Sequence, residues 1–366
     1  MGNLTTETSS RKRNRKQIKE LLVDCDIHHA VRSYDELKPY LPRTWWERLE
    51  EVNANLPVSM FYRAKGLFAD DTKTEVGIPG SDPDLAKDQL LDKYDVDIGV
   101  LTGSIYGASA HYNPDYGSAM ASAFNDYTLD KWIAHDERWR GSIIIAATDP
   151  IQAAQEINRL GSHPKMIQVL MTFGSRELYG QRRFYPIYEA AEKHNLPIAI
   201  HLGGEGAGIN PSVSAAGYPT SNFERHNILP IHAMSHLNSF ICEGVFEKFP
   251  GLKIVFVESG LAWIPGLLWR MDKNFKGLRT DAPWLKRYPS EYIIDHVRFT
   301  SQPIEEPNNY EHLLQLFDMI HADKTVMFST DYPHWDTDDP SFVLKRLPER
   351  YKERIAGETA RELYRL

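Results

Sequence analysis

The feature that most constrains the fold is a repeated alternation of short apolar runs with longer stretches of helical spacing. Eight runs rich in Val, Ile and Leu have the length of strands, and most lack the polar and apolar alternation of a half-exposed strand. They are 21–28, 96–102, 142–148, 166–172, 197–202, 253–258, 297–301 and 325–329. Such runs are typical of strands buried on both faces of a parallel sheet.

Helical patterns separate these runs. They cover 86–94, 119–135, 151–160, 184–194, 231–249, 264–275, 310–321 and 341–366. This alternation predicts a closed (β/α)₈ barrel. The alternative is an open doubly wound sheet, which would have a glycine-rich phosphate turn after its first strand. That position holds Cys25-Asp26-Ile27-His28-His29 instead, which favours the barrel.

Two connections are long enough to be insertions in such a barrel. Residues 34–83 follow the first strand, and residues 203–230 follow the fifth. Loops after barrel strands emerge on the catalytic face, so both are candidate lids over a site. With these insertions, residues 21–366 are expected to form a single domain, preceded by a flexible basic arm at 1–20.

Charge and composition exclude several classes of protein. A net charge of −8 argues against a nucleic-acid partner bound through a general basic surface. The sequence has no apolar run of roughly 18 residues or more, so we expect no membrane association. The two cysteines fit a reducing compartment, and the apolar core of a signal peptide is missing at the N-terminus, so we expect a cytoplasmic protein that acts on a small molecule.

Acidic and imidazole residues stand at the ends of several runs. Asp26 and His28 end the first run, and their spacing places both side chains on one side of a strand. His201 ends the fifth run, and Asp331 follows the eighth. Barrels do their chemistry at this edge. Two imidazoles and two carboxylates suit one divalent ion such as Zn²⁺, Mn²⁺ or Fe²⁺ rather than Ca²⁺.

Several motifs together resemble one known family. They are the segment 23–28, Ile198-Ala199-Ile200-His201, the segment 245–255, the segment 263–272 with Arg270-Met271-Asp272, and Ser329-Thr330-Asp331-Tyr332-Pro333-His334. On these motifs, nearly the whole chain after the N-terminal arm is similar to the amidohydrolase superfamily. Within it, the chain looks like the amidohydrolase-2 branch, which includes aminocarboxymuconate-semialdehyde decarboxylase and γ-resorcylate decarboxylase.

The resemblance implies a role for each candidate ligand. Asp26 and His28 stand at the family's metal-binding His-x-His motif, with a carboxylate in place of the first histidine. His201 stands at the metal histidine of strand five, and Asp331 at the metal aspartate of strand eight. The stretch 167–171 has no counterpart of the strand-four lysine that bridges a second metal, so a mononuclear centre is implied. Zn²⁺ is the first expectation, with Mn²⁺ or Fe²⁺ as alternatives, and the branch implies a homodimer or homotetramer.

One position departs from the branch. Its decarboxylases usually end strand six in a catalytic histidine, where this chain has Glu258. A glutamate near a metal acts as a general acid or base when burial raises its pKa, or it orients a histidine. We expect His236, on the helix after the fifth strand, to be the partner of Glu258; the alternative is that His236 only packs between its helix and the barrel.

Residues beside the candidate ligands complete the predicted site. His29 and His334 are candidates for substrate contact, and Trp335 is a candidate wall for an aromatic or enol ring, whereas the other histidines, His226 among them, are interpreted as structural. The predicted function is a metal-dependent non-oxidative decarboxylase of a small aromatic or enol carboxylate. The alternative is a hydrolase of an amide, lactone or carbon–carbon bond, with Asp331 as general base. A barrel that only binds a ligand is a third reading, and the intact ligand set argues against it.

Overall fold

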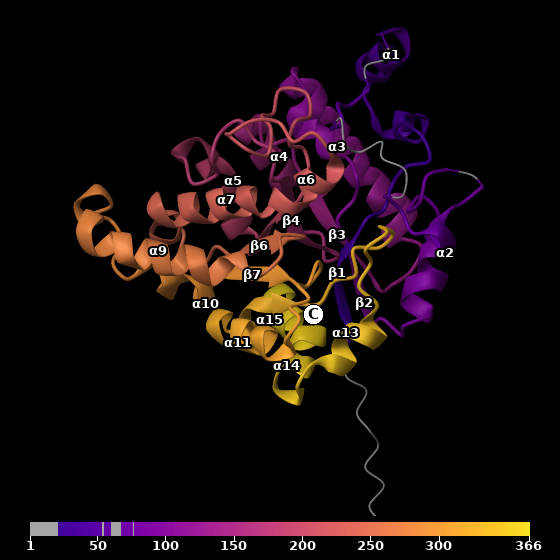
Figure 1. The fold of residues 1–366 in the computed structure, drawn as a ribbon. Coiled ribbons are helices and arrows are strands. Elements are labelled where there is room, and N and C mark those ends of the chain that lie inside the picture. Colours follow the sequence, from indigo (N-terminus) through magenta and orange to yellow (C-terminus); the bar gives the residue numbers. More distant parts are fainter. Residues whose placement is uncertain (1–20, 53–54, 60–66, 76) are drawn as a thin grey trace, which may run out of the picture.

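Eight parallel strands form the centre of the computed structural model, which describes residues 21–52, 55–59, 67–75 and 77–366 (Figure 1). They are β1 (Val23–Ile27), β2 (Ile98–Leu101), β3 (Trp139–Ile144), β4 (Met166–Thr172), β5 (Ile198–His201), β6 (Ile254–Val257), β7 (Val297–Thr300) and β8 (Val326–Met327). Each strand pairs with the next, and the Cys25 N–H closes the barrel by donating to the Phe328 carbonyl at 3.0 Å. The predicted (β/α)₈ barrel is confirmed, whereas the predicted arm at 1–20 lies outside the described residues.

Helices surround this sheet (Figure 1). They are α1 (Arg43–Val52), α2 (Pro83–Ala86), α3 (Pro114–Tyr127), α4 (Pro150–Leu160), α5 (Tyr185–Lys193), α6 (Asn222–Ile228), α7 (Pro230–Cys242), α8 (Val245–Lys248), α9 (Trp263–Leu278), α10 (Tyr292–His296), α11 (Tyr310–Ile320), α12 (Ala322–Thr325), α13 (Pro340–Arg346), α14 (Glu349–Glu353) and α15 (Thr359–Tyr364). Turns of π type continue α2 over Lys87–Asp92, α3 over Thr128–Ile133 and α14 over Arg354–Glu358.

Local signals explain where several elements begin and end. The Asp149 side chain accepts from the N–H groups of Ile151 and Gln152 at 3.0 and 3.1 Å, which starts α4 at Pro150. The helix predicted over 231–249 is two helices, because Gly244 adopts φ +71° between α7 and α8. The third strand begins at Trp139, earlier than predicted, and its last paired residue is Ile144.

The two long connections contain helices of their own. The connection after β1 includes a 3₁₀ helix at Tyr34–Tyr40, α1 and a short 3₁₀ turn at Asp70–Thr72. The connection after β5 includes α6. Both send residues to the cavity described below.

The last helix, α15, closes one end of the barrel through polar contacts with the strands. Tyr364 of α15 donates its hydroxyl to Gln168 Oε1 at 2.8 Å, and the Gln168 amide donates to Ser142 at 2.9 Å. All three residues lie in or against the strands, so side chains fill the barrel interior at this end. The other end of the barrel is the one that can hold a site. Among the described residues, no helix is long and apolar enough to cross a membrane.

Candidate active site

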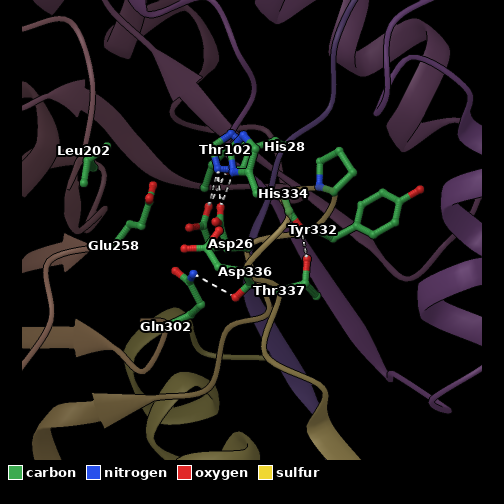
Figure 2. A network of polar contacts seen from close by, with 12 residues as sticks. Asp26, His28, Thr102, Leu202, Glu258, Gln302, Tyr332, His334, Asp336 and Thr337 are labelled. Carbon is green, nitrogen blue, oxygen red and sulfur yellow. Dashed lines mark hydrogen bonds and ion pairs between the residues drawn. The ribbon is translucent and has the colours of Figure 1, made fainter. Parts of the chain in front are cut away.

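Acidic and imidazole side chains converge where β1, β5, β6 and β8 end (Figure 2). Within the described parts of the chain, two groups have potential ligand atoms within 4.8 Å of one another. The first is Asp26, His28, His201 and Glu258, and the second is His28, Asp331 and His334. His28 belongs to both groups, so the two form one continuous cluster across the barrel mouth.

Distances within the cluster show how closely the ligand candidates face one another. His201 Nε2 lies 3.2 Å from both carboxylate oxygens of Asp26. His28 Nε2 lies 2.8 Å from Asp331 Oδ1 and 3.7 Å from Asp26 Oδ1. Glu258 Oε2 lies 3.8 Å from His201 Nε2. The structure thus brings together all four residues predicted as metal ligands and adds Glu258 to them.

Backbone acceptors set which ring nitrogen of each histidine faces the cluster. His201 Nδ1 lies 2.6 Å from the Leu202 carbonyl, and His28 Nδ1 lies 2.9 Å from the Gly103 carbonyl. A carbonyl only accepts, so Nδ1 carries a proton in both rings and Nε2 is the nitrogen that faces the cluster, where it can offer a lone pair to a metal ion or carry a second proton. The Tyr106 hydroxyl, 2.8 Å from His28 Nδ1, donates to Gly103 and agrees with this tautomer.

This arrangement fits a divalent cation. Imidazole lone pairs that face carboxylate oxygens at 3.2 and 2.8 Å repel unless a proton or a cation lies between them. Asp331 Oδ2 is a buried atom without a hydrogen-bond partner among the described residues. Two neutral imidazoles and the carboxylates beside them are the donor set that Zn²⁺, Mn²⁺ and Fe²⁺ accept. The cluster therefore supports a single divalent metal ion.

Two of the acidic residues stand in a strained backbone conformation. Glu258 has φ +54° and Asp331 has φ +63°, values that residues other than glycine seldom adopt. The Glu258 N–H is held by the Thr300 hydroxyl at 3.0 Å, and the Asp331 N–H by the Asp26 carbonyl at 3.2 Å. Such strain persists when the surrounding structure imposes it, and it is concentrated at functional sites.

The two acids differ in protonation. Burial, reinforced by the charges of Asp331 and Asp26, raises the pKa of Glu258 well above its usual value. Burial also opposes ionisation of Asp331, but the adjoining His334 and His28 outweigh it and hold the pKa of Asp331 well below its usual value. These opposite shifts favour the ionised form of Asp331 and the protonated form of Glu258, so the two carboxyl groups are suited to different chemical roles.

A cavity of about 470 Å³ opens above the cluster. Its floor includes His28, His201, Glu258 and His334, and Trp335 stands at its side with 59% of its surface exposed. His334 Nδ1 lies 2.8 Å from Asp331 Oδ1. The predicted contact residues His334 and Trp335 therefore do face the space that a substrate would fill.

His29 lies elsewhere, and its predicted substrate contact is wrong. Its Nε2 lies 2.7 Å from the Thr128 hydroxyl, and its ring packs against Phe124 and Trp132 with centroids 4.9 and 5.2 Å away. The reason is strand alternation, because a residue next to the inward His28 faces the surrounding helices.

His236 does not pair with Glu258 as predicted. Its Nε2 donates to the Phe173 carbonyl at 2.9 Å, its Nδ1 accepts from the Tyr179 N–H at 3.4 Å, and its ring stacks on Tyr179. Burial lowers the pKa of His236 to about 3, so this imidazole stays neutral. Both ring nitrogens form hydrogen bonds with the backbone of the connection after β4, so His236 has a structural role.

Other residues at the site escaped the sequence interpretation. The Thr102 hydroxyl donates to Asp26 Oδ1 at 2.6 Å, and Thr102 and Tyr106 both follow β2 at the catalytic edge, a position that could have indicated them. Arg225, His226 and Asp336 also line the cavity. His226, interpreted from the sequence as structural, is thus a pocket residue. It lies on α6, a short helix inside the long connection after β5, where no helix was predicted.

Comparison with known proteins agrees with this geometry. The sequence matches the family described as Amidohydrolase (Amidohydro_2) over residues 23–366. The chain belongs to the amidohydrolase family. It is 23% identical over 299 residues to γ-resorcylate decarboxylase of Polaromonas sp. (strain JS666), covering 76% of this chain and 86% of that protein. It is 24% identical over 296 residues to the enzyme of the same name from Rhodococcus jostii (strain RHA1), with the same coverages.

Solved structures of other proteins show the same fold. 5-Carboxyvanillate decarboxylase from Sphingomonas paucimobilis superposes with a TM-score of 0.69 at 22% identity. The match covers 95% of this chain and 100% of that protein. The 5-carboxyvanillate decarboxylase from Novosphingobium aromaticivorans, solved with manganese and 4-hydroxy-3-methoxy-5-nitrobenzoic acid, superposes with a TM-score of 0.70 at 18% identity, covering 94% of this chain and 96% of that one. At these identities the likeness establishes the fold.

Proposed function

We propose that this amidohydrolase is a metal-dependent, non-oxidative decarboxylase of a small aromatic or enol carboxylate. The observation that carries the proposal is Glu258, a buried acid that faces the cavity with its Oε2 3.8 Å from His201 Nε2 and whose pKa is raised by burial. Decarboxylation needs a proton donor beside the carbon that loses the carboxylate, and Glu258 is such a donor. The decarboxylases among its relatives support the same reaction type.

Asp26, His28, His201 and Asp331 would hold the metal. We propose Zn²⁺ as the first ion to test, with Mn²⁺ and Fe²⁺ beside it, because the donor set does not select sharply among them. When bound, such an ion supplies positive charge that orients the substrate carboxylate and an adjacent hydroxyl or keto oxygen. Thr102 keeps Asp26 turned toward it, and Tyr106 does the same for His28.

The residues of the chain then account for the chemistry. The Glu258 proton is transferred to the ring or enol carbon that bears the carboxylate, and Glu258 is left ionised. The bond from that carbon to the carboxylate breaks, its electron pair restores the ring or double bond, and carbon dioxide leaves. The apolar cavity walls keep water from the carbon while it is protonated.

The position and charge of Asp331 support a second candidate function. Because its carboxylate stays ionised beside His28 and His334, it is also placed to take a proton from water, as a hydrolase of an amide, lactone or carbon–carbon bond requires. The two functions differ in their products. The hydrolase produces an acid when it cleaves an uncharged bond, whereas the decarboxylase consumes a carboxylic acid.

The test is incubation of metal-loaded protein with a panel of hydroxybenzoates, followed for carbon dioxide. In deuterated water, the decarboxylase places one deuterium at the carbon that carried the carboxylate. Glu258→Gln should lower turnover by about 100-fold or more while the bound metal stays near its wild-type amount. Asp331→Asn should lose both the metal and the activity. Cleavage of lactones or amides without loss of any carboxylate would replace the decarboxylase by the hydrolase.

The setting of the enzyme is part of the proposal. We propose a cytoplasmic homodimer or homotetramer that acts on a small molecule and has no nucleic-acid or membrane partner. The net charge of −8 argues against a nucleic-acid partner, and the branch that the chain resembles supports the oligomer. Sedimentation of the purified protein tests the oligomeric state.

A further inference from the structure

The cavity has a polar floor and an apolar outer part. The floor carries the cluster that would react with a carboxylate, whereas the outer part is lined by Pro57, Val58, Leu67, Phe68, Ile78 and Trp335. Val58, Ile78 and Trp335 expose 52%, 47% and 59% of their surfaces. Large apolar side chains exposed around one opening mark a surface that binds an apolar ligand.

Backbone hydrogen bonds hold this outer wall in place. The Trp335 N–H donates to the Leu67 carbonyl at 3.1 Å, and the Ala69 N–H donates to the Pro333 carbonyl at 3.0 Å. Phe68 pairs with His334 in an isolated antiparallel bridge, and their rings stack with centroids 5.6 Å apart. The apolar wall is therefore fastened to the segment that carries the floor residue His334, and it is formed before a ligand arrives.

The size of the cavity exceeds what one ring needs. Its volume of about 470 Å³ lies in the range of roughly 300–1,000 Å³ that encloses drug-sized ligands. A single substituted benzene ring with its carboxylate on the floor would leave the outer wall in contact with water. The outer wall is therefore matched to an additional apolar part of the ligand.

The charges around the cavity disfavour a second carboxylate. Arg225 is 2% exposed, and its Nε donates to Glu205 Oε1 at 2.8 Å while Nη2 donates to the same oxygen, so Glu205 offsets its charge. Asp336 lines the same space and its carboxylate would repel another anion, and the protonated Glu258 offers no positive charge to attract one. Arg32 also lines the cavity, but it is exposed and its charge is screened by solvent.

We propose that the substrate is a hydroxyaryl monocarboxylate with a bulky apolar part, such as a second fused ring. The carboxylate lies on the floor, and the apolar part lies between Phe68 and Trp335. The inference rests on the proposed decarboxylase function only for the carboxylate end of the substrate. The apolar end is inferred from the outer wall of the cavity.

Binding to the manganese-loaded protein tests the class of substrate without turnover. Three probes are titrated by calorimetry: salicylate, a hydroxynaphthoate with the same ortho hydroxyl, and a hydroxyisophthalate that adds a second carboxylate to one ring. The hydroxynaphthoate should bind about tenfold tighter than salicylate or better, because its additional carbons leave water. The hydroxyisophthalate should bind no tighter than salicylate. Equal or weaker binding of the hydroxynaphthoate would overturn the proposal.

Variants of the outer wall test which residues cause the preference for the hydroxynaphthoate over salicylate. Trp335→Ala and Ile78→Ser should each narrow the ratio of hydroxynaphthoate to salicylate affinity by about threefold or more. Trp269→Ala is the matched control, since Trp269 on α9 is 62% exposed and does not line the cavity, and this variant should keep the wild-type ratio. A ratio unchanged in both Trp335→Ala and Ile78→Ser would refute the role of the wall. If the preference holds but no probe loses its carboxylate, the proposed reaction fails while the class of ligand stands.

Discussion

Asp24 fixes the residue that precedes Asp331, although 306 positions separate Asp24 from Thr330 in the chain. Its Oδ1 accepts from the Thr330 N–H at 3.0 Å, and its Oδ2 accepts from the Thr330 hydroxyl at 2.6 Å. The next residue, Asp331, donates its N–H to the Asp26 carbonyl at 3.2 Å. The end of β8 is thus tied to β1 by a buried carboxylate, and this tie places Asp331 against His28.

Removing this carboxylate should loosen both the barrel and the metal site. Asp24→Ala leaves two buried Thr330 donors without an acceptor, and we expect the free energy of unfolding to fall by about 2–4 kcal/mol. Misplacement of Asp331 should also weaken Mn²⁺ binding by roughly 10- to 100-fold. Urea unfolding and metal titration measure the two effects. Asp97→Ala is the control, because Asp97 accepts from the Leu22 N–H at 2.9 Å and should affect stability alone.

Thr102 should tune the metal site without supplying a ligand. Thr102→Val removes the hydroxyl that donates to Asp26 Oδ1 at 2.6 Å, so Asp26 can rotate and Mn²⁺ affinity should fall by about tenfold or more. Thr325→Val is a matched control, because this buried hydroxyl donates to the Ile320 carbonyl at 2.8 Å. The control should lose roughly 1 kcal/mol of stability and keep its metal affinity. Equal metal affinities in the two variants would contradict the positioning role of Thr102.

His236 should make the fold sensitive to acid. Burial lowers the pKa of His236 from 6.5 to about 3, so between these values the unfolded chain binds a proton that the folded chain does not. Stability is therefore lost as pH falls from 6.5 toward 3, by up to about 1.4 kcal/mol per pH unit. His236→Gln should flatten this slope, whereas exposed His312→Gln should not. An unchanged slope in His236→Gln, measured by urea unfolding at several pH values, would show that other groups carry the acid response.

The sequence allowed the barrel and its metal-ligand candidates to be predicted for one reason. Strands of a parallel barrel end at one edge, so Asp26, His28, His201 and Asp331 had to approach one another once the strands were recognised. The same rule of alternation, applied to His29, would have placed it against the helices.

Tertiary contacts set the remainder of the site. The helical spacing of His236 defines a face of α7, but only the packed structure shows that the Phe173 carbonyl and Tyr179 N–H meet that face. Arg225 lies on the short helix α6 and Glu205 in the irregular segment between β5 and α6, so their pairing depends on a loop path that no local pattern encodes.

That pair of residues offers a final test of how the pocket wall is built. Arg225 and Glu205 are each 2% exposed, and Glu205 Oε2 is buried without a partner among the described residues. Glu205→Ala removes the carboxylate that faces the buried guanidinium of Arg225 and should lower the free energy of unfolding by about 3–5 kcal/mol. The double variant Glu205→Leu with Arg225→Met removes both charges and should recover most of that loss. Urea unfolding of the wild type, Glu205→Leu, Arg225→Met and the double variant measures the coupling. Additive losses would mean that Arg225 is stabilised by its other contacts, such as that with Asn222 at 3.2 Å, rather than by Glu205.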